Sequence, residues 1–114
     1  MKIIPLLFLF FTANSSMAQT GTLTITVTDS TTSEIIPNAH IIVSKKNGFR
    51  QEGTTDYTGI FRLRDLPPDT FEIYCDKPLY NKEIRKGVVI GSNTISFVDF
   101  KLNKSKPTIP LKKD

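Results

Sequence analysis

The sequence has little of the residues that usually hold metals or crosslinks: one cysteine and one histidine among 114 residues. A structural zinc site needs about four such ligands, and a catalytic site about three with a water, so a self-contained Cys/His zinc site is excluded. A single cysteine also excludes a disulfide framework within the chain. With 39% hydrophobic and 23% charged residues, the composition is that of one folding domain and not of a disordered chain.

Long apolar runs are absent except at the start, where Ile3–Phe11 follows Lys2. This run is shorter than the roughly 20 residues that span a bilayer, which disfavours the alternative of an uncleaved membrane anchor. A polar stretch follows it and ends in Ser16–Ala18, with small residues three and one before a cleavage point. The layout predicts a secretory signal peptide over residues 1–18 and a chain exported from Gln19 onward, periplasmic or secreted.

The body of the chain has no net positive charge, whereas its end is strongly basic. Residues 19–100 hold nine basic and ten acidic side chains, whereas residues 101–114 hold five basic and one acidic. A nucleic-acid interface would need a basic stripe with interleaved aromatic residues on the domain, so no nucleic-acid partner is expected. Residues 103–114, with two prolines, are predicted to form a basic disordered tail. Weak attachment of this tail to an anionic surface is its functional alternative.

Helical periodicity is also missing after residue 18, and alternation of apolar and polar residues recurs instead. In Thr22–Thr28, for example, Leu23, Ile25 and Val27 alternate with threonines. Turn signals about every 8–12 residues, with one apolar face per strand, predict an all-β sandwich of seven strands. The predicted strands are Thr22–Thr28, Asn38–Ser44, Phe49–Thr54, Ile60–Arg64, Phe71–Asp76, Lys82–Ile90 and Thr94–Leu102.

Turn residues separate these strands. Lys45–Gly48 ends in Asn-Gly, which favours a type I′ hairpin turn. Asp56 can accept backbone N–H bonds across its turn, and Gly59 can adopt positive φ. Pro37 fixes φ before one strand, and Pro67 breaks the chain after another. Pro37, Asp56, Gly59 and Pro67 are therefore predicted to be structural turn residues.

The inward faces of the strands predict the core. The residues expected there include Ala39, Phe61, Leu63, Phe71, Ile73, Phe100 and Leu102. Cys75 shares the apolar face of its strand with two of them, which predicts a buried inert thiol, with an intermolecular disulfide as the alternative.

Four segments occur in a recognisable order: GTLTITVTD at Gly21–Asp29, IIPNAHIIV at Ile35–Val43, TTDYTGIFRLRDLPPDTFEI at Thr54–Ile73, and ISFVDFKL at Ile95–Leu102. Their most specific part is Thr-Thr-Asp-x-x-Gly-x-Phe-x-Leu followed by Leu-Pro. Together they resemble the carboxypeptidase regulatory-like domain. The resemblance implies a seven-stranded, Greek-key, transthyretin-like β-sandwich, here over residues 19–102. The chain departs from the family pattern at Asp69, where glycine is usual, and at Lys77–Tyr80, which lacks Gly-Tyr.

The resemblance implies a non-catalytic module, since such domains sit beside carboxypeptidase catalytic domains and at the start of TonB-dependent receptors. Some transthyretin-like proteins are 5-hydroxyisourate hydrolases, which use more than one histidine, an arginine and a C-terminal Tyr-Arg-Gly-Ser. This chain has only His40 and ends in Leu-Lys-Lys-Asp, so a small hydrolase is the least favoured function. His40 is expected on the surface. Neither catalytic nor cofactor-binding nor metal-ligating residues are expected, and the turn acids lack EF-hand spacing.

An exported accessory or binding protein of the cell envelope is therefore expected, with a protein partner in the envelope or extracellular space. A carbohydrate or a peptide is the alternative partner. An open sandwich leaves unpaired N–H and C=O rows on its edge strands, which another chain can extend. The polar strand Phe49–Thr54 is predicted to be such an edge, with Arg50, Gln51 and Glu52 as partner contacts. Gln51→Pro is expected to weaken partner binding without unfolding the domain.

Overall fold

The computed structural model describes residues 19–105, so the predicted signal peptide and residues 106–114 of the predicted tail lie outside it. The described chain forms seven strands, each within one or two residues of its predicted ends. They are β1 (Gly21–Asp29), β2 (His40–Ser44), β3 (Arg50–Thr54), β4 (Ile60–Leu66), β5 (Asp69–Asp76), β6 (Glu83–Ile90) and β7 (Ile95–Leu102). The predicted number and order of strands are confirmed.

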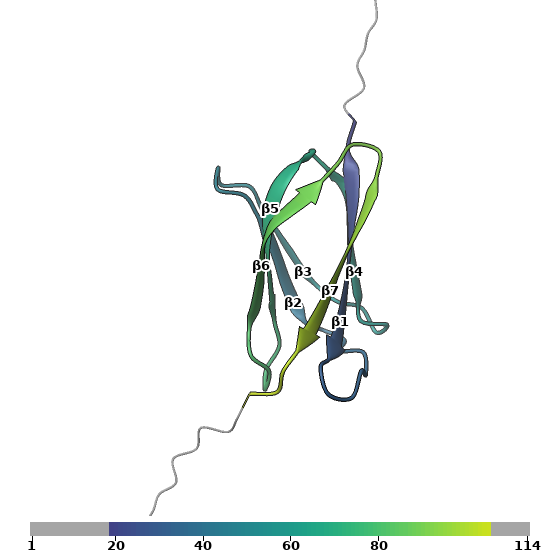
Figure 1. Ribbon diagram of the computed structural model, residues 1–114, viewed down its shortest axis with the longest axis vertical. Coiled ribbons are helices and arrows are strands. Elements are labelled where there is room, and N and C mark those ends of the chain that lie inside the picture. The colour runs from purple at the N-terminus through teal and green to yellow at the C-terminus, as the bar shows by residue number, and fades with distance from the viewer. Residues whose placement is uncertain (1–18, 106–114) are drawn as a thin grey trace, which may run out of the picture.

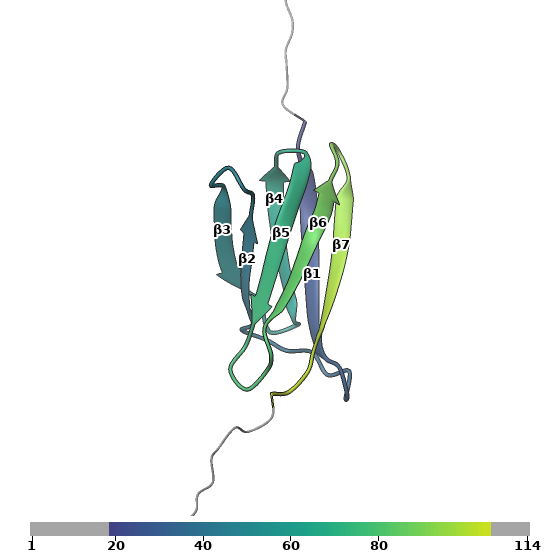
Figure 2. The same ribbon diagram turned by 60° about the vertical axis from the view of Figure 1, so that its left-hand side comes forward.

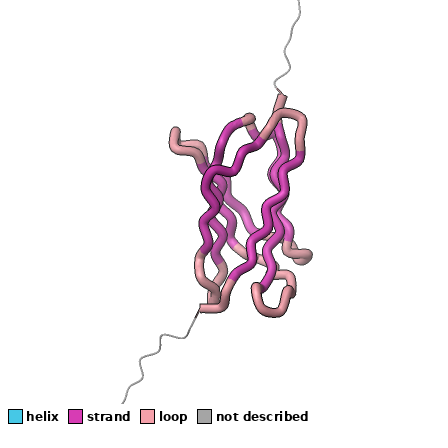
Figure 3. Tube along the Cα trace, in the orientation of Figure 1, coloured by secondary structure: helices cyan, strands magenta, loops and turns pink. Residues whose placement is uncertain are grey.

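The strands form two sheets, one of three strands in the order β4-β1-β7 and one of four in the order β3-β2-β5-β6. Figures 1 and 2 show the two sheets as facing layers, and Figure 3 shows the loops gathered at the two ends of the strands. β1 and β7 run parallel from Thr22↔Ile95 to Asp29↔Leu102, whereas every other paired neighbour is antiparallel. The all-β sandwich predicted from the alternation is confirmed.

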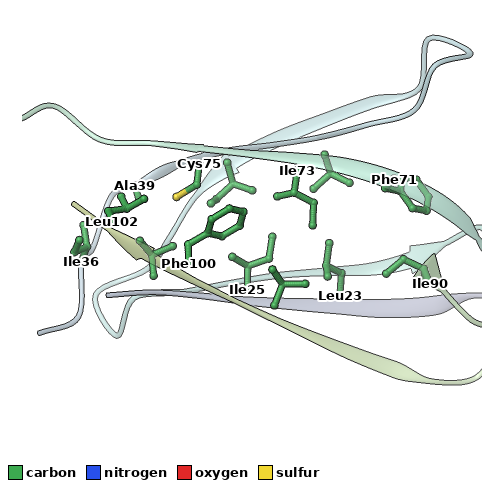
Figure 4. Packing of buried hydrophobic residues seen from close by; sticks show 14 of the residues in the cluster. Leu23, Ile25, Ile36, Ala39, Phe71, Ile73, Cys75, Ile90, Phe100 and Leu102 are labelled. Atoms are coloured by element: carbon green, nitrogen blue, oxygen red, sulfur yellow. The ribbon is translucent and has the colours of Figure 1, made fainter. Parts of the chain in front are cut away.

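The core lies between the sheets, where side chains from one layer meet those from the other (Figure 4). Phe61 and Leu63, predicted to lie in the core, are only partly buried, because β4 is an outer strand of its sheet. The other residues predicted for the core are buried. The buried cluster comprises Leu23, Ile25, Val27, Ile36, Ala39, Ile41, Val43, Leu66, Phe71, Ile73, Cys75, Ile90, Val98, Phe100 and Leu102.

The hairpin between β2 and β3 differs from its prediction. The Lys45 carbonyl accepts a bond from the Gly48 N–H at 3.2 Å, and the Lys45 N–H donates to the Phe49 carbonyl at 3.0 Å. Gly48 has a φ of 105°, but Asn47 is not in the positive-φ region, which a type I′ turn requires at both central residues. The predicted turn type is wrong: a three-residue loop forms, and the Asn47 side chain accepts the Phe49 N–H at 3.0 Å instead.

The turn between β3 and β4 is organised by one carboxylate. Oδ1 of Asp56 accepts the N–H of Thr58 at 2.9 Å and the N–H of Ile60 at 3.1 Å. Gly59 has a φ of 79°, and a Cβ there would lie 3.0 Å from Cβ of Ile35. This turn therefore needs both a short acceptor and a residue without a side chain.

Residues 103–105, the last that the structure describes, pack against the loop between β5 and β6. The N–H of Asn81 donates to the carbonyl of Asn103 at 2.9 Å, and the N–H of Ser105 donates to the carbonyl of Leu79 at 3.0 Å. Composition predicts that residues 103–105 belong to a disordered tail, but these bonds hold them against the β5–β6 loop. The described domain therefore continues past residue 102.

Candidate edge-strand site

The predicted contact residues lie on β3, which is an outer strand of the four-stranded sheet (Figure 2). Its one neighbour within the described residues is β2. Arg50, Gln51 and Glu52 are all exposed. All three predicted residues therefore lie on a strand whose outer edge is unpaired by any other described strand.

The hydrogen bonds at the two ends of β3 show which main-chain groups remain available. The Lys45 N–H donates to the Phe49 carbonyl at 3.0 Å, and the Thr55 N–H donates to the Ala39 carbonyl at 2.9 Å. Because bonded pairs alternate in antiparallel strands, the main-chain groups of Gln51 and Gly53 face β2. The N–H and C=O groups that face the free edge belong to Arg50, Glu52 and Thr54.

Polar side chains of β2 and β3 form a network on the outer face of the sheet. Oε1 of Glu52 lies 2.7 Å from Nε2 of His40, and Oε2 of Glu52 accepts Nη2 of Arg50 at 3.1 Å. These bonds, chiefly the one to His40 and then those to Arg50, lower the pKa of the Glu52 carboxyl. Glu52 therefore stays ionised, and His40, exposed as predicted, partners it.

The inner face of β3 is held close to the other sheet at one glycine. A Cβ built at Gly53 would lie 2.5 Å from Cε1 of Phe61, a residue of β4. The glycine thus allows the β3 edge to approach the partly buried ring at this side of the sandwich. Sequence patterning could not assign this role, because the two residues meet only when the sheets pack.

The other outer strands carry interruptions that β3 lacks within the described range. β6 contains Gly87 at a φ of 70° and a register shift against β5. On β7, the carbonyl of Asp99 accepts Nη2 of Arg85 at 2.9 Å, and the Arg85 guanidinium covers the Phe100 ring at 4.8 Å. On β4, Asp65 has a φ of 60°. Bulges and covered edges obstruct strand addition, so β3 is the best candidate edge.

A cleft of about 560 Å³ lies at the end of the sheet that carries the β2–β3 hairpin. Nζ of Lys45 lies 2.8 Å from Oδ2 of Asp69 and 5.6 Å from the centre of the Phe71 ring. The bond from Lys45 lowers the pKa of the Asp69 carboxyl. Lys46 and Lys86 also line the cleft. The sequence pattern does not predict this cleft, because its walls come from three segments that only the fold brings together.

Other predicted features of the site can be placed directly. Among residues 19–105, no three His, Cys, Asp or Glu side chains gather in a group that could hold a metal ion. In the same part of the chain, no helix is long and apolar enough to cross a membrane.

Pro37 and Pro67 are exposed and lie in the connections before β2 and after β4.

The succession of strands and turns over the domain agrees with a known family. A model of the carboxypeptidase regulatory-like domain matches residues 22–103. The chain belongs to this family. A search of curated protein sequences finds no match to this regulatory-like domain.

Solved structures with the same fold include two pilus proteins. The regulatory-like domain is 22% identical to the Bacillus anthracis TIE protein, with a TM-score of 0.67 over 75% of this chain and 17% of that one. For the group B streptococcus pilus 2b backbone protein, identity is 18% and the TM-score 0.62, over 76% and 42%. For the major pilin subunit of Bacillus cereus, identity is 20% and the TM-score 0.61, over 76% and 31%. The chain spans less than half of each protein, and the likeness shows the β-sandwich fold.

Proposed function

We propose that this regulatory-like domain is an exported, non-catalytic interaction module that binds an extended segment of a partner protein along β3. The observation that carries the proposal is the uninterrupted free edge, with main-chain groups of Arg50, Glu52 and Thr54 facing outward. In strand addition, main-chain hydrogen bonds supply affinity, and neighbouring side chains supply specificity. The network of His40 and Glu52 beside this edge would supply the specificity.

Two observations support an envelope or extracellular setting. Residues 1–18 have the three-part layout of a secretory signal peptide. Two of the similar solved structures are a pilus backbone protein and a major pilin subunit. The chain would act there as an accessory or binding protein, through contacts and not through catalysis.

The test is partner capture with the full chain, tagged at its C-terminus and recovered from its native envelope and medium. Proline at Glu52 removes an N–H that faces the free edge, a position where sheets tolerate proline. Glu52→Pro is expected to abolish capture of a specific partner, whereas the matched variant Glu52→Gln, which loses the carboxylate charge but keeps the outward N–H, is expected to weaken capture without abolishing it. Equal capture by wild type and Glu52→Pro would refute binding at this edge.

The direction of the main-chain N–H groups makes Glu52, and not Gln51, the position for this proline substitution. The N–H of Gln51 faces β2, so Gln51→Pro would remove a bond inside the sheet and destabilise β3 itself. The expected separation of binding from folding therefore does not hold at Gln51.

A second candidate function is binding of a carbohydrate or a peptide in the cleft beside the β2–β3 hairpin. Its support is the cleft of about 560 Å³, with Lys46, Asn47 and Lys86 as donors along its wall. A ligand of the folded state raises the melting temperature in proportion to RT ln(1 + [L]/Kd). A glycan and peptide screen by thermal shift tests it, with Lys46→Ala expected to remove any shift. A shift that survives in Lys46→Ala would place the ligand elsewhere.

A further inference from the structure

We infer that the β3 edge pairs with β3 of a second copy of this chain, antiparallel, with Arg50 of each copy opposite Glu52 of the other. The inference rests on the proposed use of the β3 edge and names one partner for it. The pairing would join two four-stranded sheets into one continuous sheet across a twofold axis.

The main chain restricts the possible registers. The groups that face outward from β3 belong to Arg50, Glu52 and Thr54, so only these positions can bond to a second edge. In an antiparallel self-pair, each bonded pair must therefore combine two even-numbered residues. The main-chain groups of Gln51 and Gly53 bond to β2, so Gln51 contributes only its side chain at the new seam and Gly53 contributes none.

Charge then selects among these registers. A register centred on Gln51 places Arg50 opposite Glu52 of the second copy, and Glu52 opposite its Arg50. Two cross-strand ion pairs result, and opposite charges in directly opposed positions are favourable. The registers centred on Arg50 or on Glu52 instead oppose two like charges, which is unfavourable. The order Arg-Gln-Glu thus complements itself when the strand is reversed.

The side chains lie where this pairing needs them. Arg50 and Glu52 are the register partners of Ser44 and Ile42 of β2. The residues that alternate with these on β2, Ile41 and Val43, point into the core, so the side chains of Arg50 and Glu52 lie on the outer face of the sheet. The same register places Thr54 opposite Gly48 of the second copy. Gly48 has no side chain, and a Cβ built there would meet no atom within 4 Å of its own chain. The position opposite Thr54 therefore presents no side chain at the seam.

The contact follows the geometry of twofold homodimers, in which the same patch is used by both copies. The ion pairs are exposed, so they would set the register more than the affinity. Association is expected to be weak and to decrease with salt, because exposed charges are screened.

The test is a charge-reversal cycle followed by sedimentation across a concentration series. Arg50→Glu and Glu52→Arg each oppose like charges at both pairs, so each variant is expected to self-associate at least about tenfold more weakly than wild type. An equimolar mixture of the two variants brings opposite charges together at both pairs and is expected to associate again. The double variant Arg50→Glu/Glu52→Arg is expected to self-associate like wild type.

Controls and contrary outcomes follow from the same register. Lys101→Glu reverses an exposed charge on β7, the strand at the far side of the three-stranded sheet from β4, and is expected to leave association unchanged. Circular dichroism melts check that each variant folds, and Arg50→Gln replaces any reversal that does not. Single variants that associate like wild type, or a mixture that stays monomeric, would overturn this register.

The failure of this inference is distinguishable from failure of the proposed function. Wild type that stays monomeric up to about 1 mM would overturn self-pairing. Capture of another protein by wild type and not by Glu52→Pro would then leave the edge-strand function standing. Self-association that Glu52→Pro does not change would overturn self-pairing through this edge.

Discussion

Tyr80 donates its hydroxyl to Oδ2 of Asp29 across 2.7 Å and thereby ties the β5–β6 loop to the end of β1. Asp29 is only 4% exposed, and its Oδ1 accepts the N–H of Thr31 at 2.8 Å and that of Thr32 at 3.0 Å. The bond from Tyr80, followed by these two, lowers the pKa of Asp29 to about 2. One ionised carboxylate at the end of β1 therefore binds both the turn that follows β1 and the β5–β6 loop.

This carboxylate predicts how stability depends on acid. The folded pKa of about 2 lies below the ordinary 3.8, so the stabilisation is complete above about pH 4 and is lost as the pH falls toward 2. Tyr80→Phe removes the largest cause of the shift. Melts between about pH 2 and 6 should show wild type more stable than Tyr80→Phe at the upper end, with a difference that shrinks as the pH falls.

The control for this experiment is Tyr57→Phe, because Tyr57 is 84% exposed and lies in the turn before β4. Its melting curve should follow wild type at each pH. A difference between wild type and Tyr80→Phe that is constant across the pH range would show that the bond does not act through Asp29 ionisation.

The hydroxyl of Thr55 is predicted to stabilise the fold through two buried hydrogen bonds that an apolar residue cannot make. It is 1% exposed, its hydroxyl donates to the carbonyl of Ile36 at 2.8 Å, and its oxygen accepts the N–H of Ala39 at 2.9 Å. Thr55→Val would leave both groups buried without partners and lower the free energy of unfolding by about 3 kcal/mol. Urea denaturation measures the change, with exposed Thr54→Val as control; equal losses in both would contradict this role.

Phe71 is predicted to be indispensable to the core. It is 1% exposed, and its ring meets the Phe49 ring edge to face at a centroid distance of 5.5 Å. Phe71→Ala should cost about 3–5 kcal/mol, a large share of the stability of a small domain, and leave the protein unfolded or insoluble. Phe97→Ala, at a site 73% exposed, is the control and should melt like wild type. A near-wild-type melt of Phe71→Ala would refute the core assignment.

Cys75 should be unreactive in the folded protein. It is fully buried, and burial raises the pKa of its thiol to about 12. The thiolate, which is the reactive form, is therefore scarce at neutral pH. A thiol reagent such as dithionitrobenzoate should modify no cysteine in native protein and one per chain in denaturant. A disulfide-linked dimer on a non-reducing gel would instead support the alternative of an intermolecular bond.

Several features could be predicted because they depend on neighbours in the chain. Alternation along Gly21–Asp29 assigns an inner and an outer face whatever the strand pairs with, since successive side chains point to opposite sides. Asp56 and Gly59 could be assigned to a turn because the bonds and φ that they supply are local. The type of the Lys45–Gly48 turn could not, because Asn-Gly fits more than one loop length.

The sequence alone determined that this chain is an all-β member of its family, with seven strands, a buried cysteine and a polar third strand. Tertiary structure decided which side of β3 is unpaired and that Tyr80 bonds to Asp29. It also decided that a proline substitution at Glu52 removes an outward N–H, whereas one at Gln51 removes a bond inside the sheet. The reason is physical: period and turn chemistry act over a few residues, whereas hydrogen-bond direction and burial depend on which strands become neighbours.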